Sequence, residues 1–99
     1  MAYILSWSPR AVEDLDSIAA YVAADSEYYA ASVVRSILQK TRKLSEFPFL
    51  GRMVPEFEDE SIREIFAYSY RIIYQIDSEE ITIAAVIHGR RNLEMAVKP

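Results

Sequence analysis

Cysteine is absent from this chain of 99 residues, and histidine occurs only once, as His88. The lack of cysteine excludes a disulfide framework, a thiolate zinc site and a cysteine nucleophile. A single histidine leaves only a carboxylate-rich set of metal ligands, which suits zinc poorly, so we expect neither a metal nor a cofactor. Only two glycines and four prolines are present, which argues against a low-complexity chain.

Long hydrophobic runs are missing as well. No apolar stretch approaches the roughly 20 residues that a membrane span requires, and no basic segment precedes the apolar residues near the N-terminus. We therefore expect a cytoplasmic protein that does not contact membranes. Hydrophobic residues make up 52% and charged residues 26% of the chain, as in folded globular proteins. The length predicts one domain, over residues 1–99.

The charged residues are unevenly distributed. The net charge of −4 does not favour binding to a phosphate backbone. Residues 1–27 nevertheless hold five acids and one base, whereas residues 28–43 hold four bases and no acid. These four bases either meet an acidic partner segment or form a solvated helix face. They are Arg35, Lys40, Arg42 and Lys43.

The first half of the chain predicts a strand and a helical hairpin. Residues 3–7 have the composition of a short strand. Ser8-Pro9 is a helix-start signal, because the hydroxyl can cap the first turn and proline fits the first helical position. Apolar residues then recur at helical spacing to about Ala24. A second amphipathic helix follows residues 25–26 and ends before Pro48. Because only residues 25–26 separate the two helices, they are expected to form an antiparallel hairpin.

The second half predicts a loop and three strands. Residues 46–60 show neither period, and we expect the apolar residues of this loop to pack on the core: Phe47, Phe49, Leu50, Val54 and Phe57. Strands follow over residues 62–68, 70–76 and 81–87. Strict alternation places Ile81, Ile83, Ala85 and Ile87 on one face of the last strand. The predicted α+β architecture is β-α-α-β-β-β, an antiparallel four-stranded sheet packed on an N-terminal helical hairpin.

Few residues could carry chemistry. The sequence has no glycine-rich phosphate loop, no His-Glu-x-x-His motif and no serine nucleophile motif. RNA cleavage requires a proton acceptor, a proton donor and cations near the phosphate, and His88 is the only side chain that ordinarily titrates near neutral pH. A ribonuclease site of Arg63, Arg71 and His88 therefore requires the three to share one face. Otherwise His88 bonds locally and the arginines pair with acids.

Tyrosines are a second feature with two interpretations. They either stack on nucleic-acid bases or belong to the core and its rim, with a solvated hydroxyl. They are Tyr28, Tyr29, Tyr68, Tyr70 and Tyr74.

Four ordered segments resemble the RelE/ParE toxin superfamily, and its ParE branch in particular. The first, residues 3–21, contains a strand, a Ser-Pro pair and an Asp-Leu pair. The second, residues 47–52, is similar to the Pro-x-x-Gly-Arg loop of that family. Residues 62–65 with 70–74 resemble its middle strands, and residues 83–91 resemble its last strand. The resemblance covers nearly the whole chain in the right order.

This resemblance implies the toxin of a type II toxin–antitoxin system of the plasmid-stabilisation kind, neutralised in a hetero-oligomer by a small ParD-like antitoxin. ParE toxins act on DNA gyrase, whereas RelE toxins cut messenger RNA in the ribosome. The chain lacks the lysine-rich catalytic loop and the terminal tyrosine of the RelE pattern, so we expect a non-enzymatic gyrase inhibitor. The alternatives are a ribosome-dependent endoribonuclease and a decayed toxin that only binds its partner.

Two sets of contacts are expected, the first from the charge of the second helix and the second from the resemblance. The helix bases Arg35, Lys40, Arg42 and Lys43 are expected to meet the acids of the antitoxin. The residues expected to bind the target are Arg52, Arg71, His88, Arg90 and Arg91. For the ribonuclease alternative, the candidate catalytic residues remain Arg63, Arg71 and His88.

Overall fold

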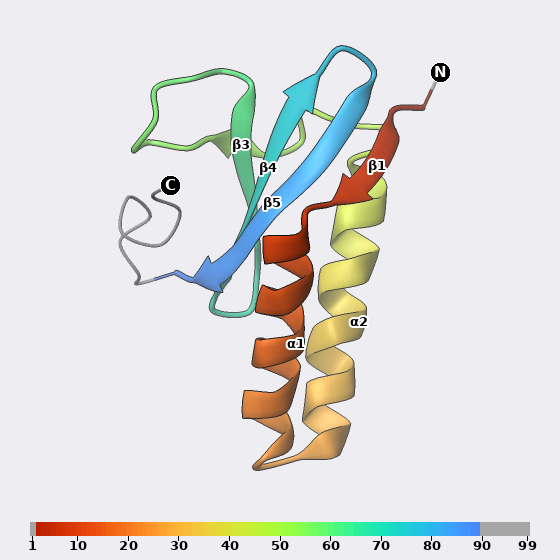
Figure 1. The fold of residues 1–99 in the computed structure, drawn as a ribbon, viewed down its shortest axis with the longest axis vertical. Helices are drawn as coiled ribbons and strands as arrows, with labels where there is room; N and C mark the ends of the chain where they lie inside the picture. Colours follow the sequence, from red (N-terminus) through yellow and green to blue (C-terminus); the bar gives the residue numbers. More distant parts are fainter. Residues whose placement is uncertain (1, 90–99) are drawn as a thin grey trace.

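A computed structural model of the chain describes residues 2–89. Its elements are β1 (Ile4–Trp7), α1 (Pro9–Ala23), α2 (Glu27–Lys43), β2 (Arg52–Met53), β3 (Ile62–Ala67), β4 (Tyr70–Asp77) and β5 (Glu80–His88). The helices lie side by side as a hairpin, which extends well below the sheet (Figure 1). The predicted α+β class and the order of the predicted elements are confirmed, with β2 as an additional strand. Within residues 2–89, neither helix has the length and apolarity needed to cross a membrane.

Both helices begin at the serines that precede them. The Ser8 side chain accepts a hydrogen bond from the Ala11 amide, and Pro9 occupies the first helical position of α1. Ser26 caps α2 in the same way by accepting from the Tyr29 amide. Each cap satisfies an amide at a helix start that has no partner within the helix, a contribution of about 1 kcal/mol. Local chemistry therefore determines where each helix begins.

The sheet differs from the expected antiparallel four-stranded sheet in two respects. It has five strands in the order β1-β5-β4-β3-β2, and β1 runs parallel to β5 while the other neighbours are antiparallel. No tight turn joins β1 to β5, so no turn geometry imposes an antiparallel pairing. The additional strand β2 contains only two residues, too few for an alternating pattern to be visible in the sequence.

The main core lies between the helical hairpin and one face of the sheet. The side chains of Tyr70, Ile72, Tyr74 and Ile76 in β4 all point to this core, as their alternation predicts. Burial of each large apolar side chain stabilises the fold by roughly 1.5–3 kcal/mol. The buried members are Ala11, Val33, Ile37, Leu44, Ile65, Ala67, Ile72, Tyr74, Ile81, Ile83 and Val86.

The predicted alternation in β5 is wrong beyond Ile83. Tyr74 pairs with Ile83 and Ile73 with Ala85, so Ala84 is the additional residue of a β-bulge. A bulge shifts the period-2 pattern by one residue. Val86 therefore faces the helices, whereas Ala85 and Ile87 join a second cluster with Val54 and Ile73.

The bulge is held by two polar side chains of the segment that begins α1. The Ser8 hydroxyl donates to the carbonyl oxygen of Ala84 over 3.0 Å. Asp14 Oδ2 accepts from the backbone amide of Val86 over 2.9 Å. The Ser-Pro and Asp-Leu pairs of the sequence thus fasten α1 to an irregular part of β5 and satisfy backbone groups that the ladder leaves without partners.

The expectation that all five apolar residues of the 46–60 loop pack on the core is wrong for three of them. Val54 is fully buried and Phe57 packs against the second cluster. The other three are between 57% and 60% exposed: Phe47, Phe49 and Leu50. The turn of residues 48–51 contacts the core through its backbone. The buried Tyr74 hydroxyl donates to Pro48 O over 2.7 Å and accepts from the Gly51 amide over 3.0 Å.

Removal of the Asp14 carboxylate is expected to destabilise the protein. The Asp14→Ala substitution leaves the Val86 amide without its acceptor, so we expect the free energy of unfolding to fall by about 1–3 kcal/mol in denaturant titrations. Asp16→Ala is the matched control, because Asp16 is exposed on the same helix, and we expect a change within about 0.5 kcal/mol. Equal losses in the two variants would contradict the proposed role of Asp14.

Candidate functional site

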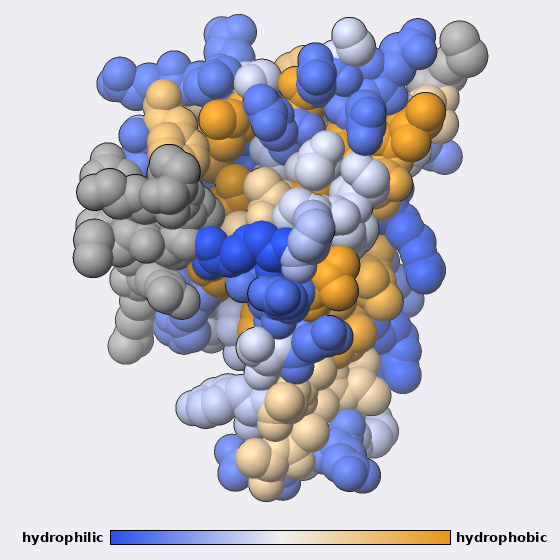
Figure 2. All heavy atoms as spheres, viewed as in Figure 1, coloured by the Kyte–Doolittle hydropathy of each residue, from blue (hydrophilic) through white to orange (hydrophobic). Residues whose placement is uncertain are grey.

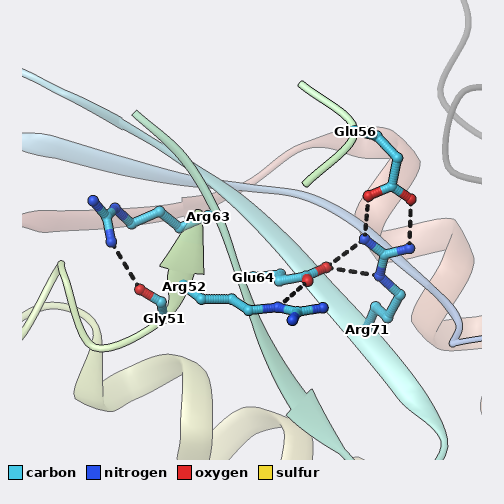
Figure 3. A network of polar contacts seen from close by, with 6 residues as sticks. All are labelled: Gly51, Arg52, Glu56, Arg63, Glu64 and Arg71. Atoms are coloured by element: carbon cyan, nitrogen blue, oxygen red, sulfur yellow. Dashed lines mark hydrogen bonds and ion pairs between the residues drawn. The ribbon is translucent and has the colours of Figure 1, made fainter. Parts of the chain in front are cut away.

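Four charged side chains of alternating sign form a chain of contacts on the sheet face opposite the helices (Figure 3). We call Arg52, Glu64, Arg71 and Glu56 the charge chain. Arg71 donates to both carboxylate oxygens of Glu56, over 2.9 and 3.0 Å. It also bonds Glu64 Oε1 through Nε at 2.7 Å. Arg52 Nε donates to the other oxygen of Glu64, also over 2.7 Å.

Burial makes these contacts necessary. The Glu64 side chain has no exposed surface, and that of Arg71 is 7% exposed. A buried carboxylate without partners loses several kcal/mol of hydration, so each of these charges requires its neighbours. Arg52 is the exposed end of the charge chain, with 60% of its side chain accessible. Its guanidinium lies over the ring of Phe66, 5.3 Å from the centroid.

The pKa values of the paired groups follow the same contacts. The hydrogen bond from Arg71 holds the pKa of the Glu56 carboxyl below its ordinary value. The bond to Glu56 likewise raises the pKa of Arg71. Arg71 is therefore a cation with a carboxylate on each side, and its positive charge is largely offset inside the protein.

Arg63 lies on the other face of the sheet. It stands opposite Tyr74 in the ladder, and Tyr74 points to the main core. The Arg63 guanidinium lies 4.7 Å from the centroid of the Phe49 ring and donates to Gly51 O over 3.0 Å. Arg63 therefore supports the turn that contains Phe49 and Gly51.

Gly51 in this turn approaches β3 and β4 too closely for any other residue. A Cβ atom there would stand 2.5 Å from the carbonyl oxygen of Glu64 and 2.7 Å from the Tyr74 hydroxyl. Glycine is the residue that permits such a close backbone approach. The close approach places Arg52, the next residue, opposite Glu64 in the β2–β3 ladder.

His88 lies at the end of β5, opposite Tyr70. The two ring centroids are 6.0 Å apart and the planes are nearly perpendicular, while burial raises the pKa of Tyr70. His88 also lines a shallow hollow of about 490 Å³ with Phe66 and Tyr68.

The structure does not bring Arg63, Arg71 and His88 together. Arg71 lies on the face opposite the helices, whereas the other two lie on the helix side: Arg63 opposite Tyr74 in the middle of β4, and His88 opposite Tyr70 at its start. Of the residues expected to bind the target, Arg52 and Arg71 are joined through Glu64. Arg90 and Arg91 lie outside the described residues.

The bases of α2 divide into two groups. Arg35 and Arg42 lie at a groove of about 680 Å³ between α1 and α2. Lys40 donates to the carbonyl oxygen of Phe66 over 2.8 Å, and Lys43 is exposed in the last turn. Apolar residues gather over the two helices, whereas the loops at the other end are mostly hydrophilic (Figure 2). The apolar lining of the groove is Ala19, Ala23, Ala30, Ala31, Val34 and Leu38.

A comparison with protein-family models identifies the chain. The model described as the ParE toxin of the type II toxin–antitoxin system parDE matches residues 5–93. The chain belongs to this family. It is thus a toxin of a type II toxin–antitoxin system, and the resemblance found in the sequence is confirmed. A search of curated proteins found no match.

Solved structures show how widely this ParE-family fold is shared. A chromosomal ParDE system from Pseudomonas aeruginosa is 22% identical, with a TM-score of 0.71 over 88% of this chain and 96% of that one. A mutant of Escherichia coli RelE in the free state is 19% identical, with a TM-score of 0.69 over 97% and 93%. The RelBE2 complex of Mycobacterium tuberculosis is 17% identical, with a TM-score of 0.64 over 89% and 99%. At these identities the likeness concerns the fold.

Two acids of the charge chain in this ParE-family protein do not stand out in the sequence. Glu64 lies in a strand and Glu56 in a loop that shows no period. The alternation of β3 was the available signal for Glu64, because it places this acid on the same sheet face as Arg71. Glu56 carried no such signal, since its loop is positioned by tertiary contacts.

The tyrosines divide between the core and the surface, and stacking on nucleic-acid bases stays a prediction. Tyr74 is fully buried and Tyr70 packs on the core. The other three, between 48% and 84% exposed, belong to the surface: Tyr28, Tyr29 and Tyr68.

The two glycines provide a test of the turn. Gly51→Ala forces a Cβ against the backbone of β3, so we expect a loss of about 1–3 kcal/mol in the free energy of unfolding. In the matched variant Gly89→Ala, the nearest atom to the new Cβ is Ser69 O at 3.2 Å, and we expect a smaller loss. A Gly51→Ala protein as stable as Gly89→Ala would show that the turn does not need the close approach.

The Glu56–Arg71 pair should make stability depend on pH. Because the folded pKa of Glu56 lies below its ordinary value of 4.5, the pair stabilises the fold above about pH 4.5, and this stabilisation is lost as the pH falls through the lowered pKa. The stability difference between the wild type and Glu56→Gln should therefore be present at pH 6 and shrink below pH 4.5. Glu58→Gln, exposed in the same loop, is the control. A constant difference between pH 6 and pH 3 would contradict the linkage.

Proposed function

We propose that this ParE-family toxin inhibits DNA gyrase by binding it and does not cleave RNA. The observation that carries the proposal is the state of Arg71, whose guanidinium is enclosed by Glu56 and Glu64. A phosphate of RNA would have to displace both carboxylates to reach it. The separation of Arg63, Arg71 and His88 supports the same choice, since general acid–base cleavage needs its groups within hydrogen-bond reach of one phosphate.

The target surface in this proposal is built around Arg52. Its guanidinium is exposed and rests on Phe66, which is itself 45% exposed. Arginine and aromatic side chains supply most of the residues that dominate protein–protein binding energy. His88, at the hollow that also contains Phe66, extends this surface, and Arg90 and Arg91 follow it in the sequence. In this arrangement Arg71 is a positioning residue, because it acts on Arg52 through Glu64.

We further propose that a ParD-like antitoxin lays an amphipathic helix in the groove between α1 and α2. The apolar lining suits the apolar face of a helix, and Arg35 and Arg42 are placed to pair with acids along it. Lys40 and Lys43 add to the positive field of α2 without lining the groove. The antitoxin segment is expected to be disordered alone and to fold on the toxin, and the result is a hetero-oligomer.

A supercoiling assay with purified gyrase tests the proposal. We expect the toxin to inhibit supercoiling and Arg52→Ala to weaken inhibition about tenfold or more, as for a residue that dominates an interface. The matched control is Arg35→Ala, which should keep inhibition and weaken antitoxin binding.

Four outcomes would contradict parts of this account. Unchanged supercoiling at saturating toxin would exclude gyrase as the target. Messenger RNA cleavage in primer extension after induction, abolished by His88→Ala, would establish the ribonuclease alternative. Normal growth on expression without antitoxin would indicate a decayed toxin. Antitoxin binding without any gain of helix signal would contradict the proposed groove occupant.

A further inference from the structure

A second hollow lies between the helical hairpin and the β3–β4 turn. Its volume is about 290 Å³, and we call it the tyrosine pocket. Four tyrosines contribute to its lining, Tyr21, Tyr29, Tyr68 and Tyr70, together with Asp25. It shares no lining residue with the groove between α1 and α2, but it shares Tyr68, Ser69 and His88 with the hollow already described at His88.

The rings of the tyrosine pocket are arranged around accessible space. Tyr29 and Tyr68 meet edge to face, with centroids 5.7 Å apart and an angle of 84° between the planes. They are 48% and 52% exposed, and Tyr21 is 78% exposed. Among residues 2–89, the hydroxyl groups of the four tyrosines make no hydrogen bond. These side chains are therefore not held at the surface by polar contacts of the fold.

Tyr68 occupies a backbone conformation that favours a smaller residue. Its φ is 55°, in the left-handed region where bulky side chains are rarely found. Glycine would fit this turn without strain. A large aromatic ring at such a position is a signal of function, because strained residues concentrate at binding and active sites.

The charge around the tyrosine pocket selects a cation. Asp25 supplies a carboxylate, and no lysine or arginine among the described residues lines the pocket. The faces of aromatic rings carry partial negative charge and attract cations. His88 also lines the pocket, with its ring against Tyr70. Residues 1–27, which supply Tyr21 and Asp25, hold five acids and one base. Asp25, the one acid among the lining residues, disfavours a ligand that bears phosphate.

We propose that the tyrosine pocket receives the guanidinium of an arginine side chain from a protein partner, with the tyrosine rings around the cation and Asp25 as its counter-ion. A planar guanidinium can stack on a ring while it donates two hydrogen bonds to a carboxylate, which a lysine ammonium cannot do. The inference rests on the proposed function in one respect, that this toxin works by binding proteins.

The test uses the full chain and two small probes of the same shape. N-acetyl-arginine amide carries the charge, and N-acetyl-citrulline amide is its neutral analogue. Titrations followed by the NMR signals of the tyrosine rings should show saturable shifts at Tyr29 and Tyr68 with the arginine probe. The citrulline probe should bind about three- to tenfold more weakly, and Asp25→Asn should reduce the affinity for the arginine probe by a similar factor.

Two tyrosine variants separate binding from folding. Tyr68→Gly removes a ring and relieves the backbone, so we expect loss of probe binding with an unchanged or higher melting temperature. Tyr28→Ala is the matched control, because Tyr28 is 84% exposed on α2 and does not line the pocket. It should leave probe binding unchanged.

Several results would overturn the proposal. Equal affinity for the two probes, unchanged binding in Tyr68→Gly, or tighter binding of a nucleoside monophosphate than of the arginine probe would each contradict it. The supercoiling assay distinguishes this failure from failure of the proposed function, because probe binding does not require gyrase. A toxin that inhibits gyrase but binds both probes equally would exclude the tyrosine pocket alone.

Discussion

The burial of one carboxylate, that of Glu64, determines how the second face of the sheet is built. The Glu64 side chain has no exposed surface, so water does not solvate its carboxylate. Cations on both sides compensate for the lost hydration, which apolar neighbours could not do. Arg52 supplies one and thereby holds the short strand β2 on the edge of the sheet. Arg71 supplies the other, and its remaining donors attach Glu56 and the loop that carries it. One buried acid thus connects β2, β3, β4 and the loop.

This connection supports the proposal that the chain binds its target and does not cleave RNA. Within the charge chain, the buried guanidinium of Arg71 is paired with two carboxylates, and the exposed guanidinium of Arg52 lies over the ring of Phe66. The charge chain and the groove between the helices occupy separate parts of the molecule, whereas the tyrosine pocket borders the hollow at His88. A toxin that must recognise a target and be neutralised by a different protein has use for distinct surfaces. Their separation would allow a variant to lose one partner and keep the other.

The sequence predicted those features that depend on neighbours along the chain. Local capping explains why the helices begin after Ser8 and Ser26. Periodicity explains the helical hairpin and the side of β4 that faces the core. The bulge at Ala84 was not predictable, because its hydrogen-bond partners Ser8 and Asp14 lie more than 70 residues away in the sequence. The exposure of Phe49 was likewise hidden, since it follows from the contact of Tyr74 with a distant turn. The arginines were found as candidates, but their acidic partners depend on the sheet register.

The most direct test of this account is gyrase inhibition by the double variant Arg71→Met/Glu64→Gln, with its fold verified by circular dichroism. Removal of both charges leaves no unpaired buried ion, and the side-chain amide introduced by Glu64→Gln can still accept a hydrogen bond from Arg52. If Arg71 acts only by positioning, this variant folds and inhibits gyrase within a few-fold of the wild type. A folded double variant that no longer inhibits gyrase would show that Arg71 itself contacts the target.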